Sequence, residues 1–196
     1  MKKELWFAGL FLTALLLAAC RQAIHNKVAL SQYLADTRNG LTQVREINRV
    51  KAAVTYLPWQ AVLSRLRRTR ADTAVVRTLK SKYYFVLGLS ANGKELLRQL
   101  PFNQYSEMVQ VMAFRLRGYV SVVTDRGKVV QAQDCSFQQT YGMGRENEVL
   151  LIFDRSELKG ANSLDLKINE FGLNIGDLDY RISTKDINQI PTIAIN

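Results

Sequence analysis

YYFVLGLSANGKELLRQL, residues 83–100, is the stretch of this sequence that most strongly indicates the fold. Its first part, residues 83–89, is apolar and aromatic, which is typical of a strand. Asn92-Gly93 follows, and this dipeptide is the strongest short-range signal for a two-residue hairpin turn. Residues 94–100 are then expected to return as a second strand. The sequence therefore predicts an antiparallel hairpin at this point of the chain.

Short apolar runs separated by turn residues continue beyond the hairpin. We expect strands at residues 108–124, 128–138, 148–154, 164–170, 178–183 and 190–195. In the first of these runs, apolar residues alternate with Arg115 and Arg117, which is the period of a strand with one buried face. Regularly spaced strands of this kind predict a mainly antiparallel β-sandwich or partly open barrel over residues 75–196.

The residues before this β-rich domain show helical spacing instead. Apolar side chains recur at intervals of three, four or seven between residues 30 and 57, and Asn39-Gly40 divides that segment. Pro58 suits the first turn of a further helix with an apolar stripe on one side and arginines largely opposite. We therefore expect an α+β protein, in which a short, basic and mainly helical region at residues 20–74 precedes the β-rich domain.

The first twenty residues have the three parts of a bacterial secretory signal. Two lysines precede thirteen uncharged residues, 5–17, and the run then ends in Leu-Ala-Ala-Cys with its cysteine at Cys20. This ending resembles the lipobox of bacterial lipoproteins. The resemblance implies removal of the signal peptide, residues 1–19, attachment of diacylglycerol to the Cys20 sulfur, and usually acylation of the new amino terminus. A palmitate-type lipid anchor at Cys20 is therefore expected.

A transmembrane anchor is the alternative interpretation of the same segment. A helix that crosses the hydrocarbon needs about 20 apolar residues, and this run is shorter. In the well-studied sorting system, an aspartate directly after the cysteine retains a lipoprotein at the inner membrane, whereas Arg21 and Gln22 follow Cys20 here. The expected location is the outer membrane, on its periplasmic side.

The net charge of +10 is concentrated next to this anchor. Residues 20–82 hold thirteen basic and three acidic side chains, and residues 83–196 hold twelve basic and thirteen acidic ones. Each basic side chain near an anionic membrane surface contributes about 1 kcal/mol. We therefore expect binding to anionic lipid or glycan, with a solvated helix face as the alternative; the export signal argues against nucleic acid. The expected binding residues, which we call the basic set, are Arg65, Arg67, Arg68, Arg70, Arg77, Lys80 and Lys82.

Residue types suited to catalysis or metal binding are scarce. His25 is the one histidine of the sequence, and it follows Cys20 so closely that we expect a linker residue. Neither a Ser-His-Asp triad of the usual kind nor a zinc site is therefore expected. With Cys20 acylated, Cys135 has no disulfide partner in the chain and is expected to be a small buried hydrophobe. Residues 142–144, Gly-Met-Gly, are expected to form a flexible loop between strands. No cofactor or metal is expected.

Three functions remain open at this point. The preferred hypothesis is a non-enzymatic binding or assembly component, an accessory lipoprotein of an envelope or secretion complex whose β-rich domain contacts a protein partner. The alternative is a module that binds glycan, peptidoglycan or another anionic ligand, for which a deep aromatic pocket is expected. A hydrolase is the third hypothesis, since glycoside hydrolysis needs only two carboxylates in one cleft. The carboxylates available for it are Asp125, Asp134, Glu146, Glu148 and Asp154.

Overall fold

The structure, a computed structural model, describes residues 23–66 and 72–194. Its helices are α2 (Lys27–Ala35), α3 (Trp59–Arg65), α4 (Thr73–Lys80), α5 (Phe102–Gln110) and α6 (Thr184–Asn188). Its strands are β1 (Thr42–Ile47), β2 (Val50–Leu57), β3 (Lys82–Ala91), β4 (Lys94–Glu95), β5 (Val120–Thr124), β6 (Val129–Gln131), β7 (Asp134–Phe137), β8 (Asn147–Asp154), β9 (Ser163–Ile168) and β10 (Leu178–Ser183). The predicted lipidation site Cys20 lies outside the described residues, as do three members of the basic set, Arg67, Arg68 and Arg70.

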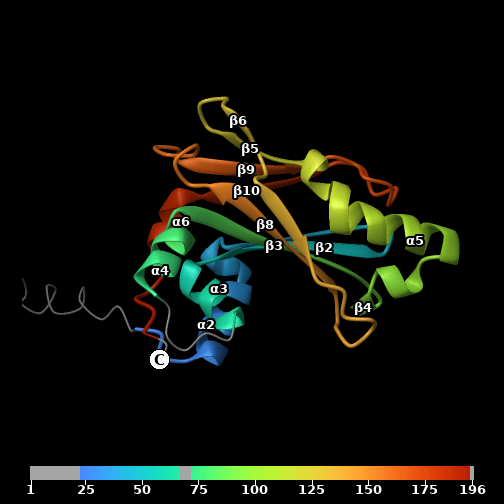
Figure 1. Cartoon of the computed structure of the whole chain (residues 1–196), viewed down its shortest axis with the longest axis horizontal. Helices are drawn as coiled ribbons and strands as arrows, with labels where there is room; N and C mark the ends of the chain where they lie inside the picture. Colours follow the sequence, from blue (N-terminus) through green and yellow to red (C-terminus); the bar gives the residue numbers. More distant parts are fainter. Residues whose placement is uncertain (1–22, 67–71, 195–196) are drawn as a thin grey trace, which may run out of the picture.

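Two antiparallel sheets lie face to face (Figure 1). The large sheet has the order β1-β2-β3-β8-β7, with β4 paired to β3, and the small sheet has the order β10-β9-β5-β6. Between them, the Tyr180 hydroxyl of the small sheet donates a hydrogen bond to the Ala52 carbonyl of the large one at 3.1 Å. The α+β class with mainly antiparallel sheets is therefore confirmed. The described strands form two sheets and do not close into a barrel.

Strand β3 is the centre of the large sheet because both of its faces can be buried. Phe85, Leu87 and Leu89 alternate along one face and are fully inaccessible inside the sandwich. The Phe85 ring makes edge-to-face contact with those of Tyr56 and Phe153, at centroid distances of 5.7 and 5.9 Å, a favoured geometry for aromatic pairs. The apolar run that begins at Tyr83 thus has the composition of a strand covered on both sides.

The prediction of a helix across residues 42–57 is wrong. These residues form the hairpin β1–β2, in which Asn48 and Arg49 have φ values of 51° and 66°, as a type I′ turn requires. Val50 and Val54 are four residues apart, and this spacing suits one face of a strand as well as one side of a helix. Strand β2 pairs along its whole length with β3. The predicted helices at α2 and α3 are present on either side of this hairpin.

The predicted strand at residues 108–124 is wrong over its first two thirds. Helix α5 begins directly after Pro101 and continues through a π-helical turn, Val111–Arg115, and a 3₁₀ turn, Leu116–Tyr119, before β5 starts. The buried side chains are Met108, Val111, Met112 and Leu116, whose spacing is helical. The alternation with arginines at 115 and 117 falls at the helix end and does not mark a buried face.

Other strand predictions differ in their limits. The three at 148–154, 164–170 and 178–183 are confirmed as β8, β9 and β10 to within two residues. Residues 94–100 form only the short β4 and then a 3₁₀ turn, and residues 128–138 divide into β6 and β7, which belong to different sheets. Residues 190–194 form no strand of the two sheets.

Ile24 ties the start of the described chain to its end. It forms a parallel bridge with Ile193, with its N–H donating to Thr192 O at 2.8 Å and its carbonyl accepting from Ala194 N at 2.9 Å. Ile24 is buried, and two residues later the Asn26 side chain caps α2. His25, predicted to be a linker residue, is exposed between these two fixed points. Among the described residues, no helix is long and apolar enough to cross a membrane.

Candidate binding groove

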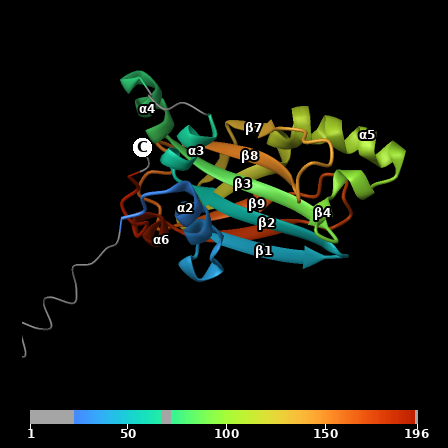
Figure 2. The same cartoon turned by 90° about the horizontal axis from the view of Figure 1, so that it is seen from below.

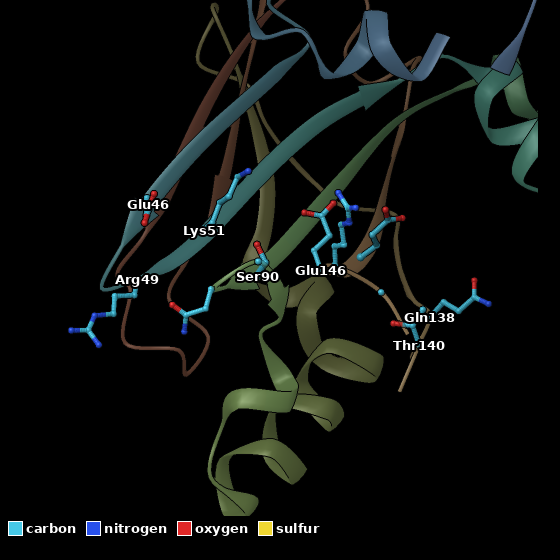
Figure 3. A pocket seen from close by; sticks show the side chains of 12 residues that line it. Glu46, Arg49, Lys51, Ser90, Gln138, Thr140 and Glu146 are labelled. Atoms are coloured by element: carbon cyan, nitrogen blue, oxygen red, sulfur yellow. The ribbon is translucent and has the colours of Figure 1, made fainter. Parts of the chain in front are cut away.

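The outer face of the large sheet, which points away from the small sheet, is covered over only part of its length. Helices α2 and α3 lie over one end, and the strands continue beyond them to the turn ahead of β4 (Figure 2). The uncovered end holds an open cavity of about 1070 Å³, which we call the outer groove (Figure 3). It is lined by Glu46, Arg49, Lys51, Ser90, Asn92, Gly93, Gln138, Thr140, Gly144, Arg145, Glu146 and Glu148.

A glycine in the middle of the sheet makes room for one of the glutamates of the groove. Ala53 of β2 pairs with Gly88 of β3, and Gly88 pairs in turn with Glu148 of β8. The carboxyl group of Glu146 lies over Gly88, so that a Cβ added at Gly88 would stand 2.5 Å from the Glu146 Cδ. Glycine is needed here because it lets a carboxyl group rest directly on the sheet. Both glutamates therefore project from the same part of the groove.

The two glutamates have different electrostatic surroundings. Glu148 Oε2 accepts a hydrogen bond from Arg65 Nη1 of α3 at 2.7 Å, within an ion pair. Glu146 is half-buried and forms no ion pair within 4 Å with any residue that the structure describes. Burial raises the pKa of Glu146, the neighbouring Glu148 raises it further, and Lys51 and Arg65 act in the opposite direction. The groove thus contains one carboxylate in an ion pair beside one whose neighbouring cations, among the described residues, lie beyond ion-pair distance.

A second, smaller cavity adjoins the groove under the helices. This cavity, which we call the apolar slot after its aliphatic residues, has a volume of about 210 Å³ and lies between α2, α3 and strands β2 and β3. Its lining also includes Lys27, Ser31, Thr55 and Ser64. The side chains of Glu146, Glu148 and Arg65 lie at its boundary, and the same two glutamates line the outer groove. The slot and the groove therefore meet at the glutamate pair. The apolar part of its lining consists of Leu30, Leu34, Ala35, Leu57, Ala61 and Val86.

One wall of the groove is a loop that Glu95 holds in place. The buried Glu95 carboxylate accepts hydrogen bonds from the backbone N–H groups of Gly142 and Gly144, both at 2.7 Å, and from the Thr140 hydroxyl. Burial alone would raise the pKa of Glu95, but these hydrogen bonds outweigh it and lower the pKa. The Gly-Met-Gly segment predicted to be flexible is therefore fixed at both glycines. Sequence reasoning missed Glu95, because its partners lie 45 to 49 residues later.

The described members of the basic set differ in their contacts. Arg65 pairs with Glu148 in the groove, and Lys82 Nζ lies 2.7 Å from Asp154 Oδ2 with a side chain only 17% exposed. Lys80 Nζ lies 5.0 Å from the centroid of the Trp59 ring, a cation–π contact. Arg77 is exposed on α4, one turn before Lys80. Two of the four described residues are thus engaged by carboxylates of the protein itself.

The carboxylates considered for hydrolysis are also separated by the fold. Asp125 accepts hydrogen bonds from Asn162, Asp154 pairs with Lys82, and neither lines the groove. Glu146 and Glu148 both line the groove.

No aromatic side chain occurs among the described residues that line the groove. In the described part of the chain, no group of three His, Cys, Asp or Glu side chains is placed to hold a metal ion.

Acid is expected to destabilise the protein through carboxylates that its backbone holds. Glu170 accepts hydrogen bonds from the N–H groups of residues 172–176, which outweigh the opposing effect of burial and lower its pKa, as for Glu95. Since the ordinary pKa of both is 4.5, the unfolded chain binds these protons first. Their stabilisation is therefore present above about pH 4.5 and lost as the pH falls through the lowered values. Urea unfolding at pH 7, 5, 4 and 3 measures this, and a midpoint that does not fall below pH 4.5 would contradict it.

The thiol of Cys135 is expected to react slowly in the folded protein. Burial, with repulsion by Asp134, raises its pKa to about 12, and the thiolate is the reactive form. In a full-length Cys20→Ser chain, Cys135 is the only thiol. We expect its reaction with Ellman's reagent at pH 8 to be at least about 100-fold slower than in 8 M urea. Equal rates in the two conditions would show that the thiol is open to solvent.

We found no match to this chain among protein-family models, curated proteins or solved structures. The function is therefore argued from the residues of the chain itself.

Proposed function

We propose that this protein is a lipid-anchored, non-enzymatic binding or assembly component of the bacterial cell envelope, and that the outer groove receives its protein partner. The proposal combines the lipobox resemblance at Cys20 with the position of the groove. The observation that carries it is that the groove is lined by residues of the β1–β2 and β3–β4 turns, Arg49, Asn92 and Gly93, and these turns lie at the end of the large sheet opposite α2, which begins three residues after Ile24 (Figure 2). A partner in the envelope space would reach that end freely.

The short distance between Cys20 and Ile24 sets the orientation of the body. Ile24 follows Cys20 by four residues, and four extended residues span at most about 14 Å. Because Ile24 is fixed by its bridge to Ile193, an acylated Cys20 would hold that end of the body against the bilayer. Helix α4, with the exposed Arg77 and Lys80, lies at the same end (Figures 1 and 2). Anionic head groups would attract these two side chains.

The lining of the groove supports a protein partner over an anionic glycan. Its charged side chains are three acids and three bases, so the groove carries no excess of positive charge. The glycan hypothesis also expected a deep aromatic pocket, and the described lining offers polar and charged groups instead. Mixed charges with hydrogen-bonding side chains are typical of the rim of a protein–protein interface.

A carboxylate-based hydrolase is the second candidate, and one observation favours it. Glu146 and Glu148 line one cavity, and burial raises the pKa of Glu146 whereas Arg65 pairs with Glu148. Unequal carboxylates of this kind can serve as acid and base. The test is hydrolysis of peptidoglycan by the full chain. Activity lost in both Glu146→Gln and Glu148→Gln would establish this candidate.

A crosslinking pull-down of the natively acylated protein from envelopes tests the preferred function. We expect one stoichiometric envelope protein with the natural sequence and at least a tenfold lower yield with Lys51→Glu, which reverses a charge in the groove. Lys159→Glu is the matched control, because Lys159 is exposed and outside the groove. Equal yields from both variants, or recovery of lipid and glycan alone, would overturn the proposal.

A further inference from the structure

The apolar slot is of a size that suits side chains. A volume of 210 Å³ corresponds to about seven water molecules at 30 Å³ each. Pockets for whole small molecules usually begin near 300 Å³. Its apolar walls come from Leu30 and Leu34 of α2, Ala61 of α3, and Leu57 and Val86 of the sheet. A bulky apolar side chain entering from outside would therefore be buried between helix and sheet.

The glutamate pair stands where such a side chain would leave the slot. Glu146 and Glu148 border both cavities, and only Glu148 has a cationic partner, Arg65, among the described residues. A Lys or Arg side chain beside Glu146 would supply the missing opposite charge. Hydrogen bonds between ionised partners are about twice as strong as neutral ones. Lys27, Arg65 and Lys51 also line the two cavities, and Glu146 is the carboxylate at the junction that forms an ion pair with none of them.

The groove beyond the junction provides partners for a polypeptide backbone. Figure 3 shows Ser90 between Lys51 and Glu146, with Glu46 on one side and Gln138 and Thr140 on the other; Gln138 is exposed and Thr140 half-buried, whereas Ser90 is buried. Hydroxyl and amide side chains of this kind can both donate to and accept from peptide groups. The groove is also several times larger than the slot. Together the two cavities can hold several residues of an extended chain.

We propose that the slot and the outer groove form one site for an extended peptide segment of the partner, with a bulky apolar side chain in the slot and, on the glutamate pair, a Lys or Arg two residues away, whose side chain points to the same side of an extended chain. This inference rests on the proposed function, which it deepens by naming the motif that the partner presents. A lipid tail is a poorer occupant, because the groove that continues from the slot is polar along its length. The slot lies beneath α2, whose first residue follows Ile24 by three positions, and the groove extends beyond it along the large sheet.

The probe is a set of fluorescein-labelled heptapeptides, Gly-Ser-X-Ser-Z-Ser-Gly, in which X and Z point to the same side of an extended chain, together with the set in which X and Z are exchanged. Fluorescence polarisation with the full-length Cys20→Ser chain measures their dissociation constants. We expect peptides with Leu or Phe at X and Lys or Arg at Z to bind at least tenfold more tightly than those with Asp at X or Glu at Z. No preference between these peptides would overturn the inference.

Two variants test the two halves of the site. Ala61→Phe fills the slot and Glu146→Gln removes the free carboxylate, and each is expected to weaken binding of the apolar-basic peptide at least tenfold. Glu157→Gln is the matched control, because Glu157 is exposed and pairs with Lys128 outside the groove. Full binding by both site variants would overturn the inference.

The stability of Glu146→Gln separates binding from folding. Because the Glu146 pKa is raised in the folded state, the ionised carboxylate destabilises the fold at pH 7. The Glu146→Gln protein is therefore expected to have a melting temperature equal to or higher than that of the natural chain, although it binds the peptide more weakly. A large loss of thermal stability would show that Glu146 has a structural role instead, and would overturn its assignment to the site.

Two further results separate this inference from the proposed function. Displacement of the peptide by lysophosphatidylethanolamine, with direct binding of this lipid lost in Ala61→Phe, would make the slot a lipid site and overturn the inference. If the pull-down still recovers its envelope protein in a manner dependent on Lys51 while the peptides show no preference, the inference fails alone. If the pull-down fails, the proposed function fails.

Discussion

Replacing Cys20 by serine is expected to move the protein from the membrane fraction to the soluble fraction. The variant keeps the sequence around the signal but has no sulfur to acylate, so it loses the acyl chains that provide stable anchoring. We expect loss of labelling by radioactive palmitate and release of nearly all of the protein by a high-salt wash. Basic side chains such as Arg77 and Lys80 can retain some protein only at low salt, because salt screens their attraction to lipid.

Cys135→Ser is the matched control for this experiment. It removes the other cysteine of the chain and is expected to keep both the palmitate label and membrane attachment. A Cys20→Ser protein that still carries the label, or that resists the high-salt wash as the natural chain does, would contradict the lipoprotein assignment. In that case no anchor at Cys20 would hold Ile24 near the bilayer, and the proposed orientation of the groove would no longer follow.

Replacing Glu95 by alanine is expected to cost about 2 to 4 kcal/mol of stability. The change leaves the N–H groups of Gly142 and Gly144 and the Thr140 hydroxyl without their shared acceptor. A buried donor left unsatisfied costs about 1 to 3 kcal/mol, and the partly open loop lets water recover some of this. Urea unfolding at pH 7 measures the change. Glu95→Gln keeps one acceptor oxygen, and its free energy of unfolding is expected to lie between those of the natural chain and Glu95→Ala.

Limited trypsin digestion gives a second measure of the same change. The released loop is expected to be cut sooner after Arg145, which follows the two anchored glycines. Glu107→Ala is the control for both measurements, since Glu107 is exposed on α5 and such surface changes usually stay within about 0.5 kcal/mol. A Glu95→Ala protein that is as stable in urea and as resistant to trypsin as this control would show that other contacts hold the loop in place.

The parts of the fold with one simple period could be predicted from the sequence. Residues 178–183 alternate Leu178, Tyr180 and Ile182 with polar neighbours, and the strand has these limits in the structure. The hairpin β1–β2 could not be distinguished from a helix, because its apolar residues fit both periods. Helix α5 was missed because a short alternating run near its end resembled a strand. Which period prevails is decided by the surfaces against which each segment packs.

The candidate site could be predicted only as a set of residue types. Glu146 and Glu148 were two of five carboxylates considered, and they share a face because they are two residues apart at the start of β8; the groove that they border depends on the pairing of β3 with β8, which places Gly88 beside Glu148. The support of the groove wall by Glu95 spans more than forty residues. Arg65 was assigned to a membrane-binding surface from its basic neighbours, whereas its guanidinium pairs with Glu148. Strand register and long-range ion pairs of this kind cannot be recognised from the neighbouring residues in the sequence.

Site-specific photocrosslinking in intact envelopes tests the central claim most directly. A benzoylphenylalanine probe replaces Gln138, which is exposed at the groove, or Thr78, which is exposed on α4 near the end that holds Ile24. We predict one discrete protein adduct from position 138, no such adduct from position 78, and loss of the position 138 adduct when Lys51→Glu is added. The same adduct from both positions, or a protein adduct from position 78 alone, would contradict the account.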